Sequence, residues 1–188
     1  FAVASADFDG DGLNGEAVYV GYTNVSYSTS ESEMFICVYD GKAETFSGTK
    51  KVGAVTPGDT LSDSFEDSGY KWMTVKMDYA WQNFLQVAAG DFDGDGTSEI
   101  AVYVVENKKA RVDIYKYQKT SQSGPNDWLD MANWRRVWSH AISGSGIVPN
   151  MVSLCTGDFN RDGVDDLAIS SGSVVVLNWI DEYYHFDL

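Results

Sequence analysis

The sequence predicts an all-β fold built of about three repeated four-stranded antiparallel sheets, and two observations carry this prediction. An acidic, glycine-rich loop between two apolar segments occurs three times in the chain. The apolar segments are short and rich in Val, Ile, Ala and Tyr, a composition that favours strands over helices. A strand, loop and strand unit that recurs with variable connections indicates a repeat protein.

The three copies match when they are aligned on the first aspartate of each loop. They are FAVASADFDGDGLNGEAVYV at 1–20, LQVAAGDFDGDGTSEIAVYV at 85–104 and VSLCTGDFNRDGVDDLAISS at 152–171. Apolar residues before the loops fall in register, and after the loops each copy has Ala followed by Val or Ile. The agreement indicates one supersecondary unit repeated three times.

Further strand-like segments follow each copy. The second strands, at 99–105 and 166–169, hardly alternate in polarity, so we expect them to be buried on both faces of their sheet. Third strands are expected at 34–39, 111–117 and 173–179, and fourth strands at 72–79 and 134–141. Four strands per repeat make the blade of a β-propeller.

We expect residues 1–188 to form a single β-propeller fragment. Repeat 1 covers about 1–80, repeat 2 about 81–147 and repeat 3 about 148–188, which is incomplete. The segments 23–33, 41–69 and 121–127 are rich in turn-forming residues and are expected to be surface insertions. Closed propellers need about four to eight blades. The chain also begins at Phe1, so we expect the missing blades in a longer parent chain or self-association through open blade edges.

The composition of the chain limits the classes of binding partner that we expect. The formal net charge of -15 argues against nucleic acid and anionic membranes, and favours multivalent cations as counter-charge. No apolar run approaches the roughly 18 residues of a membrane span. Cys37 and Cys155 lie in apolar strand patterns, which favours buried free thiols over a disulfide, although the bridge remains an alternative.

The second loop has the pattern of a calcium site. Asp91, Asp93 and Asp95 alternate at positions 1, 3 and 5, Thr97 offers a backbone carbonyl at position 7, and Glu99 supplies a carboxylate at position 9. Calcium takes about six to eight oxygen ligands, and alternating acids in a loop curled by glycine direct several of them at one centre.

The other two loops follow the same pattern with differences. The third offers Asp158, Asn160, Asp162, the carbonyl of Val164, and Asp166. The first offers Asp7, Asp9, Asp11 and the carbonyl of Leu13, but its position 9 is Gly15. Glu16, one residue later, or a water molecule would have to complete the shell. We therefore expect the first site to be the weakest of the three.

Two other structures compete with a calcium loop between strands as interpretations of these motifs. An EF-hand starts with a similar acidic run but needs a bidentate acid at position 12. Here position 12 is Val18, Val102 or Ile169, which excludes the EF-hand. Acidic turns that bind nothing would leave up to four carboxylates repelling each other within about ten residues, so metal binding is favoured.

These loops and their flanks resemble the FG-GAP, or integrin-α-like, β-propeller repeats, particularly the bacterial form called the VCBS repeat. The resemblance rests on AAGDFDGDGTSEIAVY and CTGDFNRDGVDDLAIS, with SADFDGDGLNGEAVYV as a looser copy. It implies that each loop joins the first and second strands of a blade and that its calcium is structural. The literal Phe-Gly and Gly-Ala-Pro elements are missing, so the resemblance implies no integrin-like ligand site.

Other candidate sites are weaker. No nucleophile elbow, phosphate loop or cysteine-pair motif occurs, so we name no catalytic and no cofactor-binding residue. His140 and His185 are expected to be structural. The loop acids Asp63, Glu66, Asp67, Asp127 and Asp130 are expected to be solvated. Most tryptophans should fill space between blades, and Trp128, in a polar turn cluster, is the candidate for stacking on a sugar.

The sequence thus predicts a calcium-stabilised binding or scaffolding module of a larger protein, secreted or displayed at a cell surface. Millimolar extracellular calcium suits weak structural sites. Its ligand would be a glycan or a protein, as in adhesion. The alternative is the propeller part of a secreted carbohydrate-active enzyme, such as a polysaccharide lyase or hydrolase.

Overall fold

The computed structural model describes residues 2–26, 31–40, 45–46, 73–78, 85–106, 109–142, 152–170, 174–179 and 186–187. Its elements are the strands β1 (Ala2–Ala6), β2 (Glu16–Ser26), β3 (Glu31–Asp40), β4 (Thr45–Phe46), β5 (Met73–Asp78), β6 (Leu85–Gly90), β7 (Glu99–Glu106), β8 (Lys109–Tyr117), β9 (Trp134–Ile142), β10 (Ser153–Gly157), β11 (Asp166–Ser170), β12 (Val174–Trp179) and β13 (Phe186–Asp187), and the 3₁₀ helices η1 (Asp127–Leu129) and η2 (Met131–Asn133). Within these ranges no helix is long and apolar enough to cross a membrane.

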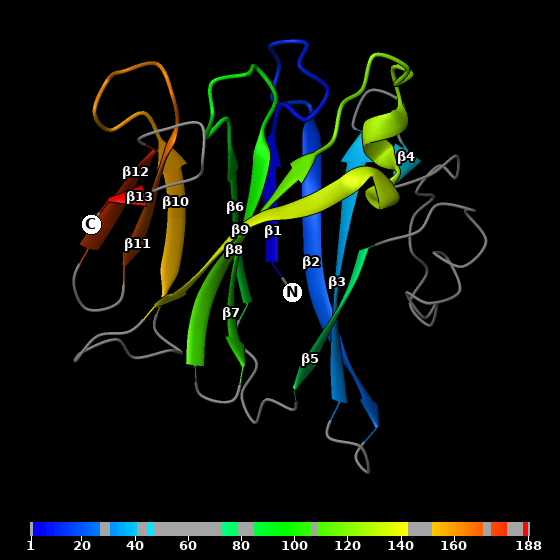
Figure 1. Ribbon diagram of the computed structural model, residues 1–188, viewed down its shortest axis with the longest axis vertical. Coiled ribbons are helices and arrows are strands. Elements are labelled where there is room, and N and C mark those ends of the chain that lie inside the picture. Colours follow the sequence, from blue (N-terminus) through cyan, green and yellow to red (C-terminus); the bar gives the residue numbers. More distant parts are fainter. Residues whose placement is uncertain are drawn as a thin grey trace.

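The strands form three antiparallel sheets in chain order, which confirms the all-β class (Figure 1). The first sheet has the order β1-β2-β3-β4, with β5 also paired to β3. The second has the order β6-β7-β8-β9 and the third β10-β11-β12-β13. Every neighbour pair within a sheet is antiparallel, as expected for strands joined by short connections.

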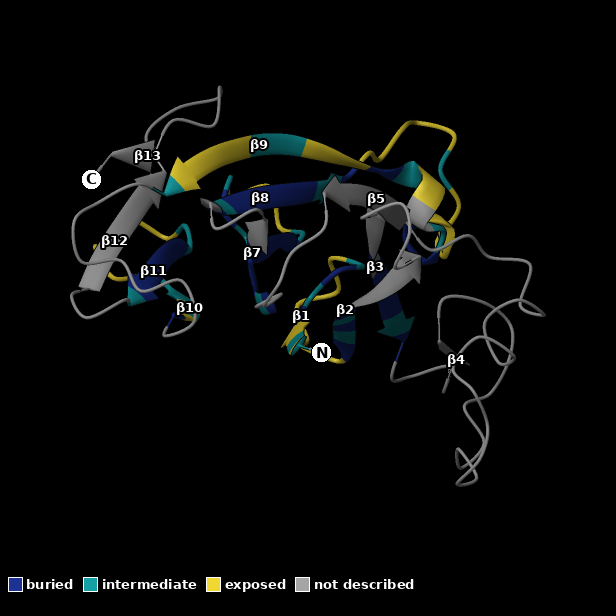
Figure 2. Cartoon of the chain, turned by 90° about the horizontal axis from the view of Figure 1, so that it is seen from below, coloured by how far each residue is buried: buried dark blue, intermediate teal, exposed yellow. Residues whose placement is uncertain are grey.

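The first strands of the three sheets lie next to one another, because β6 contacts both β1 and β10. In Figure 2, β9 lies on the upper side of the sheets, and β1 and β10 lie on the opposite, lower side. Sheets that share an inner row of first strands and diverge outward are consecutive blades of a β-propeller.

The middle sheet is buried on both faces, as its apolar sequence predicts. On β7, Ile100 and Val102 belong to a hydrophobic cluster shared with the first sheet. The alternate residues Ala101 and Tyr103 belong to a second cluster shared with the third sheet. Because successive side chains on a strand point to opposite faces, one strand contributes to two cores.

Trp128 is part of the first of these cores, so its predicted role in surface stacking is wrong. Its relative exposure is 2%. Its ring stacks on Phe8 at a centroid distance of 6.4 Å, and its carbonyl oxygen accepts a hydrogen bond from Trp134 Nε1 at 2.8 Å. The polar turn around it conceals a residue that fills the space between two blades, because η1 turns the ring inward.

Residues 23–26 and 31–33 of the predicted insertion 23–33 are strand, so these parts are regular structure rather than the turns that their composition indicates. Thr23 pairs with Glu33 and Asn24 with Ser32, and the register shifts before Ser26. Ser and Thr are compatible with an extended backbone when a neighbouring strand provides hydrogen bonds, and β3 provides them here.

The outer edge of the first sheet is built from two separate pieces of chain. Asp40 and Tyr39 of β3 pair with β4, whereas Ile36 to Glu31 pair with β5. Both short strands run antiparallel to β3. Together they take the place of the fourth strand.

Both cysteines are free, as the apolar pattern favours, but only Cys37 is buried. Burial raises the pKa of the Cys37 thiol well above its ordinary value. Cys155 is exposed, which differs from the prediction. It lies on β10, where the side-chain burial alternates between exposed and half-buried, because this strand lies in the last of the three sheets along the chain.

Candidate metal centres

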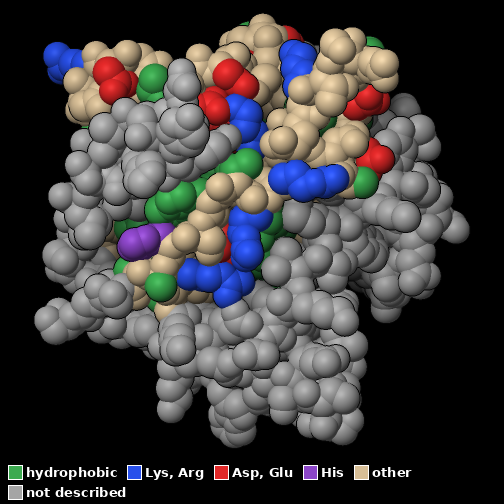
Figure 3. Space-filling model, viewed as in Figure 1, with side chains coloured by type: hydrophobic (Ala, Val, Ile, Leu, Met, Phe, Trp, Pro, Cys, Tyr) green, Lys and Arg blue, Asp and Glu red, His purple; other side chains and the backbone are tan. Residues whose placement is uncertain are grey.

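The three acidic loops lie at the same end of the sheets, the upper end in Figure 1. The first connects β1 to β2, the second β6 to β7, and the third β10 to β11. Figure 3 shows acidic side chains at this end of the molecule. Each loop therefore joins the first and second strands of its blade, as the resemblance implies.

The first aspartate of each loop holds the curl together. A carboxylate oxygen of Asp7 accepts the Gly12 N–H at 2.6 Å, and Asp91 and Asp158 accept the equivalent N–H groups at 2.9 and 3.0 Å. The donor residues Gly12, Gly96 and Gly163 have φ between 86° and 91°, a conformation that favours glycine. The alternation of acids and glycines is therefore needed for the backbone as well as for charge.

The last acid of each loop starts the second strand and is buried. Glu16, Glu99 and Asp166 each accept the N–H of the phenylalanine that follows the first loop aspartate, at 3.2, 2.8 and 3.0 Å. Glu16 therefore occupies the place of Glu99, although the first loop is one residue longer. Gly15 N–H donates to the Leu13 carbonyl at 2.8 Å, which accommodates the extra residue in a local turn.

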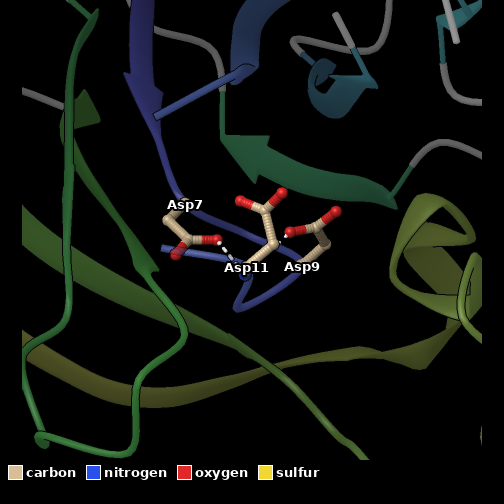
Figure 4. A group of neighbouring side chains, drawn as sticks. All are labelled: Asp7, Asp9 and Asp11. Atoms are coloured by element: carbon tan, nitrogen blue, oxygen red, sulfur yellow. Dashed lines mark hydrogen bonds between the residues drawn. The ribbon is translucent and has the colours of Figure 1, made fainter. Parts of the chain in front are cut away.

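The carboxylates of the first loop converge. Single oxygens of Asp7, Asp9 and Asp11 lie within 4.8 Å of one another. In Figure 4 the three side chains lie together over the loop, and Asp11 N–H donates to both Asp7 and Asp9, at 3.1 and 3.0 Å. These oxygens belong to the ligand type that calcium prefers.

Glu16 at the base of this loop has a carboxylate oxygen that needs a partner. Its relative exposure is 1%, and Oε1 accepts no hydrogen bond. Burial is the main cause that raises the pKa of Glu16 to about 7, with smaller contributions from the nearby Asp9, Asp7 and Asp40 and an opposing one from the Phe8 N–H. A buried, unpartnered carboxylate oxygen beside three converging aspartates fits a divalent cation.

The second loop contains a similar group and one additional residue. Asp91, Asp93 and Glu99 offer oxygens within 4.8 Å of one another. Lys116 of β8 forms ion pairs with Asp93, with Asp95 at 2.8 Å and with Glu99 at 3.3 Å. Nothing in the loop sequence itself indicates this lysine, which lies on another strand.

Electrostatics in the second loop follow from burial and from this lysine. Burial raises the pKa of Glu99 to about 8, with Asp93 adding to the rise and Lys116 opposing it. Burial alone would raise the pKa of Asp95, but hydrogen bonds from Lys116 and Thr97 hold it below its ordinary value. Burial alone would lower the pKa of Lys116, but its bonds to Asp93 and Asp95 raise it well above its ordinary value.

The third loop is exposed to solvent, and one of its ligand positions is an amide, Asn160, rather than an acid. Asn160 Nδ2 donates to Asp162 at 2.8 Å, while Asp162 N–H donates to Asn160 Oδ1 at 2.9 Å and to Asp158 at 3.0 Å. Arg161 lies where the other two loops have glycine and takes φ 65°. The predicted ligands therefore lie in the same order as in the other loops.

The loops also pack against one another, which the sequence did not reveal. A Cβ at Gly10 would lie 3.1 Å from Thr97 Cγ2, and a Cβ at Gly94 would lie 3.2 Å from Val164 Cγ2. In both cases the fourth position of one loop lies against the seventh of the next. The three loops form one continuous array.

A small hollow lies beside the first two loops. It has a volume of about 110 Å³ and is lined by residues that include Asp9, Thr97, Lys119, Pro125 and Trp128. Ligand pockets commonly measure about 300–1,000 Å³. The hollow has room for water molecules rather than for a sugar ring.

The remaining candidates have structural roles or lie outside the described residues. Asp127 and Asp130 accept backbone N–H groups of Gly124 and Ala132 within the turn. His140 is exposed and stacks on Trp138 at 5.5 Å. Asp63, Glu66, Asp67, Trp72, Trp81 and His185 lie outside the described residues.

Comparison with known families finds a match in the third repeat. The model of the FG-GAP repeat matches residues 152–177, which run from the start of β10 through the third loop and β11 into β12. This segment is similar to an FG-GAP repeat, which supports the resemblance that its loop and strands indicate. Neither the curated proteins nor the solved structures contain a match to the chain.

Proposed function

We propose that this chain is a calcium-stabilised binding or scaffolding module that works outside the cell. The observation that carries the proposal is the buried Glu16, whose unpartnered oxygen lies at the base of a loop with three converging aspartates. Burying a carboxylate without a partner is costly, and a divalent cation offsets that cost.

In this proposal the metal ligands are the acids and position-7 carbonyls of all three loops. They are Asp7, Asp9, Asp11, Leu13 and Glu16 in the first loop, Asp91, Asp93, Asp95, Thr97 and Glu99 in the second, and Asp158, Asn160, Asp162, Val164 and Asp166 in the third. Calcium supplies charge neutralisation there and fixes the start of each second strand relative to the first.

The wider role follows from what calcium would hold in place. A loop array fixed at one end of the blades leaves the other surfaces free for a glycan or protein ligand, and a net charge of -15 disfavours nucleic acid. Weak loops of this kind match the millimolar calcium found outside cells. Further blades of a parent chain, or a second copy, would cover the open sides of the outer sheets.

Thermal unfolding in calcium and in EDTA tests the proposal. We expect calcium to raise the Tm, and the rise to grow with calcium concentration, because an ion that binds only the folded state stabilises it. Glu16→Gln should reduce the rise, because the amide removes a charged ligand at nearly constant shape. A Tm that is the same in calcium and EDTA would contradict the proposal.

A further inference from the structure

The second loop contains a cation that belongs to the protein. Lys116 Nζ donates to Asp93 and, at 2.8 Å, to Asp95, and it lies 3.3 Å from Glu99 Oε1. The lysine side chain is only 15% exposed, and Glu99 is fully buried. Its ammonium group thus contacts three of the four acids of the loop, and it has three N–H donors for them.

The position of this lysine is defined by strand register. Ile100 of β7 pairs with Tyr115 of β8, so one step further along the ladder Glu99 comes opposite Lys116. In the first sheet the equivalent pair is Glu16 and Asp40. The same place beside the buried acid is therefore a lysine in one blade and an aspartate in another.

The third blade has a neutral residue at this place. Leu167 of β11 pairs with Leu177 of β12, so the next step along the ladder puts Asn178 opposite Asp166. The residue type at this register position of the third strand therefore differs between the blades. It is an aspartate in the first, a lysine in the second and an asparagine in the third.

Buried carboxylate oxygens without a hydrogen-bond partner occur in both loops, at Glu16 Oε1 in the first and at Asp93 Oδ1 and Glu99 Oε1 in the second, so the loops differ in their neighbouring charges rather than in these atoms. Glu16 Oε1 accepts no hydrogen bond, and its surroundings contain Asp7, Asp9 and Asp40. Glu99 Oε1 also accepts no hydrogen bond by geometry, yet Lys116 Nζ lies 3.3 Å away and compensates its charge. When Glu99 is ionised, this contact is an ion pair, because an attraction between full charges does not require hydrogen-bond angles.

We propose that Lys116 is a tethered counter-ion that closes the second loop without calcium, so that the first and third loops are the calcium sites. This inference rests on the proposed function and removes the second loop from its set of calcium sites. Calcium binds its oxygen ligands at about 2.3–2.6 Å, and it would compete with the ammonium group for oxygens of Asp93, Asp95 and Glu99, each of which Lys116 contacts. One loop of the array is thereby held at any calcium concentration, whereas the first loop has no lysine at the equivalent position of its third strand.

This ordering differs from the one that the loop sequences indicate. Gly15 at position 9 predicts a weak first site, but the charge around each loop depends on a residue of the third strand. Asp40 and Lys116 lie far from the loops in sequence and next to them in the sheets.

Lys116→Met tests the proposal, with Lys119→Met as the matched control. Both substitutions remove one positive charge, but Lys119 is exposed and lies in the turn after β8. We measure calcium bound per chain by equilibrium dialysis and unfolding by urea in EDTA. Lys116→Met should bind one more calcium ion than the wild type and should unfold at lower urea in EDTA, whereas Lys119→Met should match the wild type in both.

The reciprocal change tests the same idea in the first loop. Asp40→Lys places an ammonium group opposite Glu16 and should remove one bound calcium ion while reducing the loss of stability in EDTA. Asp40→Asn is its control, because the amide adds no cation and should leave the number of bound ions unchanged. Circular dichroism confirms that each variant retains its strands before binding is compared.

The outcomes separate this proposal from the proposed function. If the wild type binds one ion at every loop and Lys116→Met binds no more, the tethered counter-ion is overturned while the calcium module stands. If no chain binds calcium, the proposed function fails. The role of Lys116 then depends on urea unfolding in EDTA, where equal stability of Lys116→Met and Lys119→Met would overturn it.

Discussion

The backbone N–H of Ser98 donates a hydrogen bond to the carbonyl oxygen of Asp7 at 2.7 Å, which joins the second loop to the first. The same bond recurs one blade later, where the N–H of Asp165 donates to the carbonyl of Asp91 at 2.9 Å. Each donor residue directly precedes a buried acid, Glu99 or Asp166. Each acceptor is the carbonyl oxygen of the first aspartate in its own loop. The position of one loop is therefore transmitted to the next through a peptide group adjacent to its candidate ligands.

The side chain of Asp165 adds a second hydrogen bond between the third loop and the second. Removal of this side chain should therefore weaken the contact between the two loops. Asp165 Oδ2 accepts the N–H of Asp91 at 3.1 Å. We expect Asp165→Ala to lower the free energy of unfolding by about 1.5–3 kcal/mol, the range for a hydrogen bond to a charged group. Asp165→Asn keeps an acceptor oxygen and should cost less. Urea unfolding at fixed calcium measures both, and equal losses would show that charge rather than the bond matters.

Close approach of the same aspartate makes Gly90 sensitive to substitution. A Cβ at Gly90 would lie 2.7 Å from Asp165 Oδ2 and 3.0 Å from its Cβ. Gly90→Ala should therefore destabilise by about 1–3 kcal/mol, the usual cost of overpacking.

Gly157 provides the control for this prediction, because it pairs with Asp166 as Gly90 pairs with Glu99. A Cβ there meets Phe159 at 3.5 Å, an ordinary contact. Gly157→Ala should leave the denaturation midpoint nearly unchanged. A Gly90→Ala variant as stable as Gly157→Ala would contradict the assigned clash.

The fold class, the strand order and the place of the loops could be predicted because they depend on local patterns. Strands without alternation, such as 99–105, predict burial on both faces, and β7 shows it. Repetition of the loops also located Glu16, which takes the structural place of Glu99 despite the extra residue. Whether the loops bind calcium stays a prediction.

The features that could not be predicted depend on contacts between residues that are distant in sequence. Lys116 reaches the second loop from β8, and Trp128 turns inward from a polar turn, which no local pattern indicates. Thr23 to Ser26 extend β2 only because β3 lies beside them. Register between strands and packing between blades decide such features, and a single sequence contains them only implicitly.

The two free thiols should differ in reactivity. Cys37 is fully buried, and burial raises its pKa, so its thiolate is scarce and inaccessible. Cys155 is exposed. A disulfide reagent at mildly alkaline pH should modify Cys155 rapidly and Cys37 only after unfolding in urea. The variant Cys155→Ser should show no rapid reaction, and rapid modification of that variant would contradict the burial of Cys37.

Each loop has a phenylalanine directly after its first aspartate. The exposure of this phenylalanine distinguishes the two blades that pack against a following blade from the third blade, where none is described. Phe8 and Phe92 are fully buried, each in a cluster that joins its own sheet to the next sheet along the chain. Phe159 is their equivalent in the third loop and is 51% exposed. The same side chain thus fills the contact between blades wherever a following blade is described.

Alanine substitutions at these positions should therefore have unequal effects. Phe8→Ala and Phe92→Ala should each cost about 3–5 kcal/mol, because they leave cavities between packed sheets. Phe159→Ala should change the free energy of unfolding by no more than about 0.5 kcal/mol, as for other surface substitutions. Urea unfolding at low protein concentration measures all three, with sedimentation as a check on association. A loss at Phe159 as large as at Phe92 would mean that another blade or a second copy already covers the third sheet, because only a covered ring leaves a costly cavity.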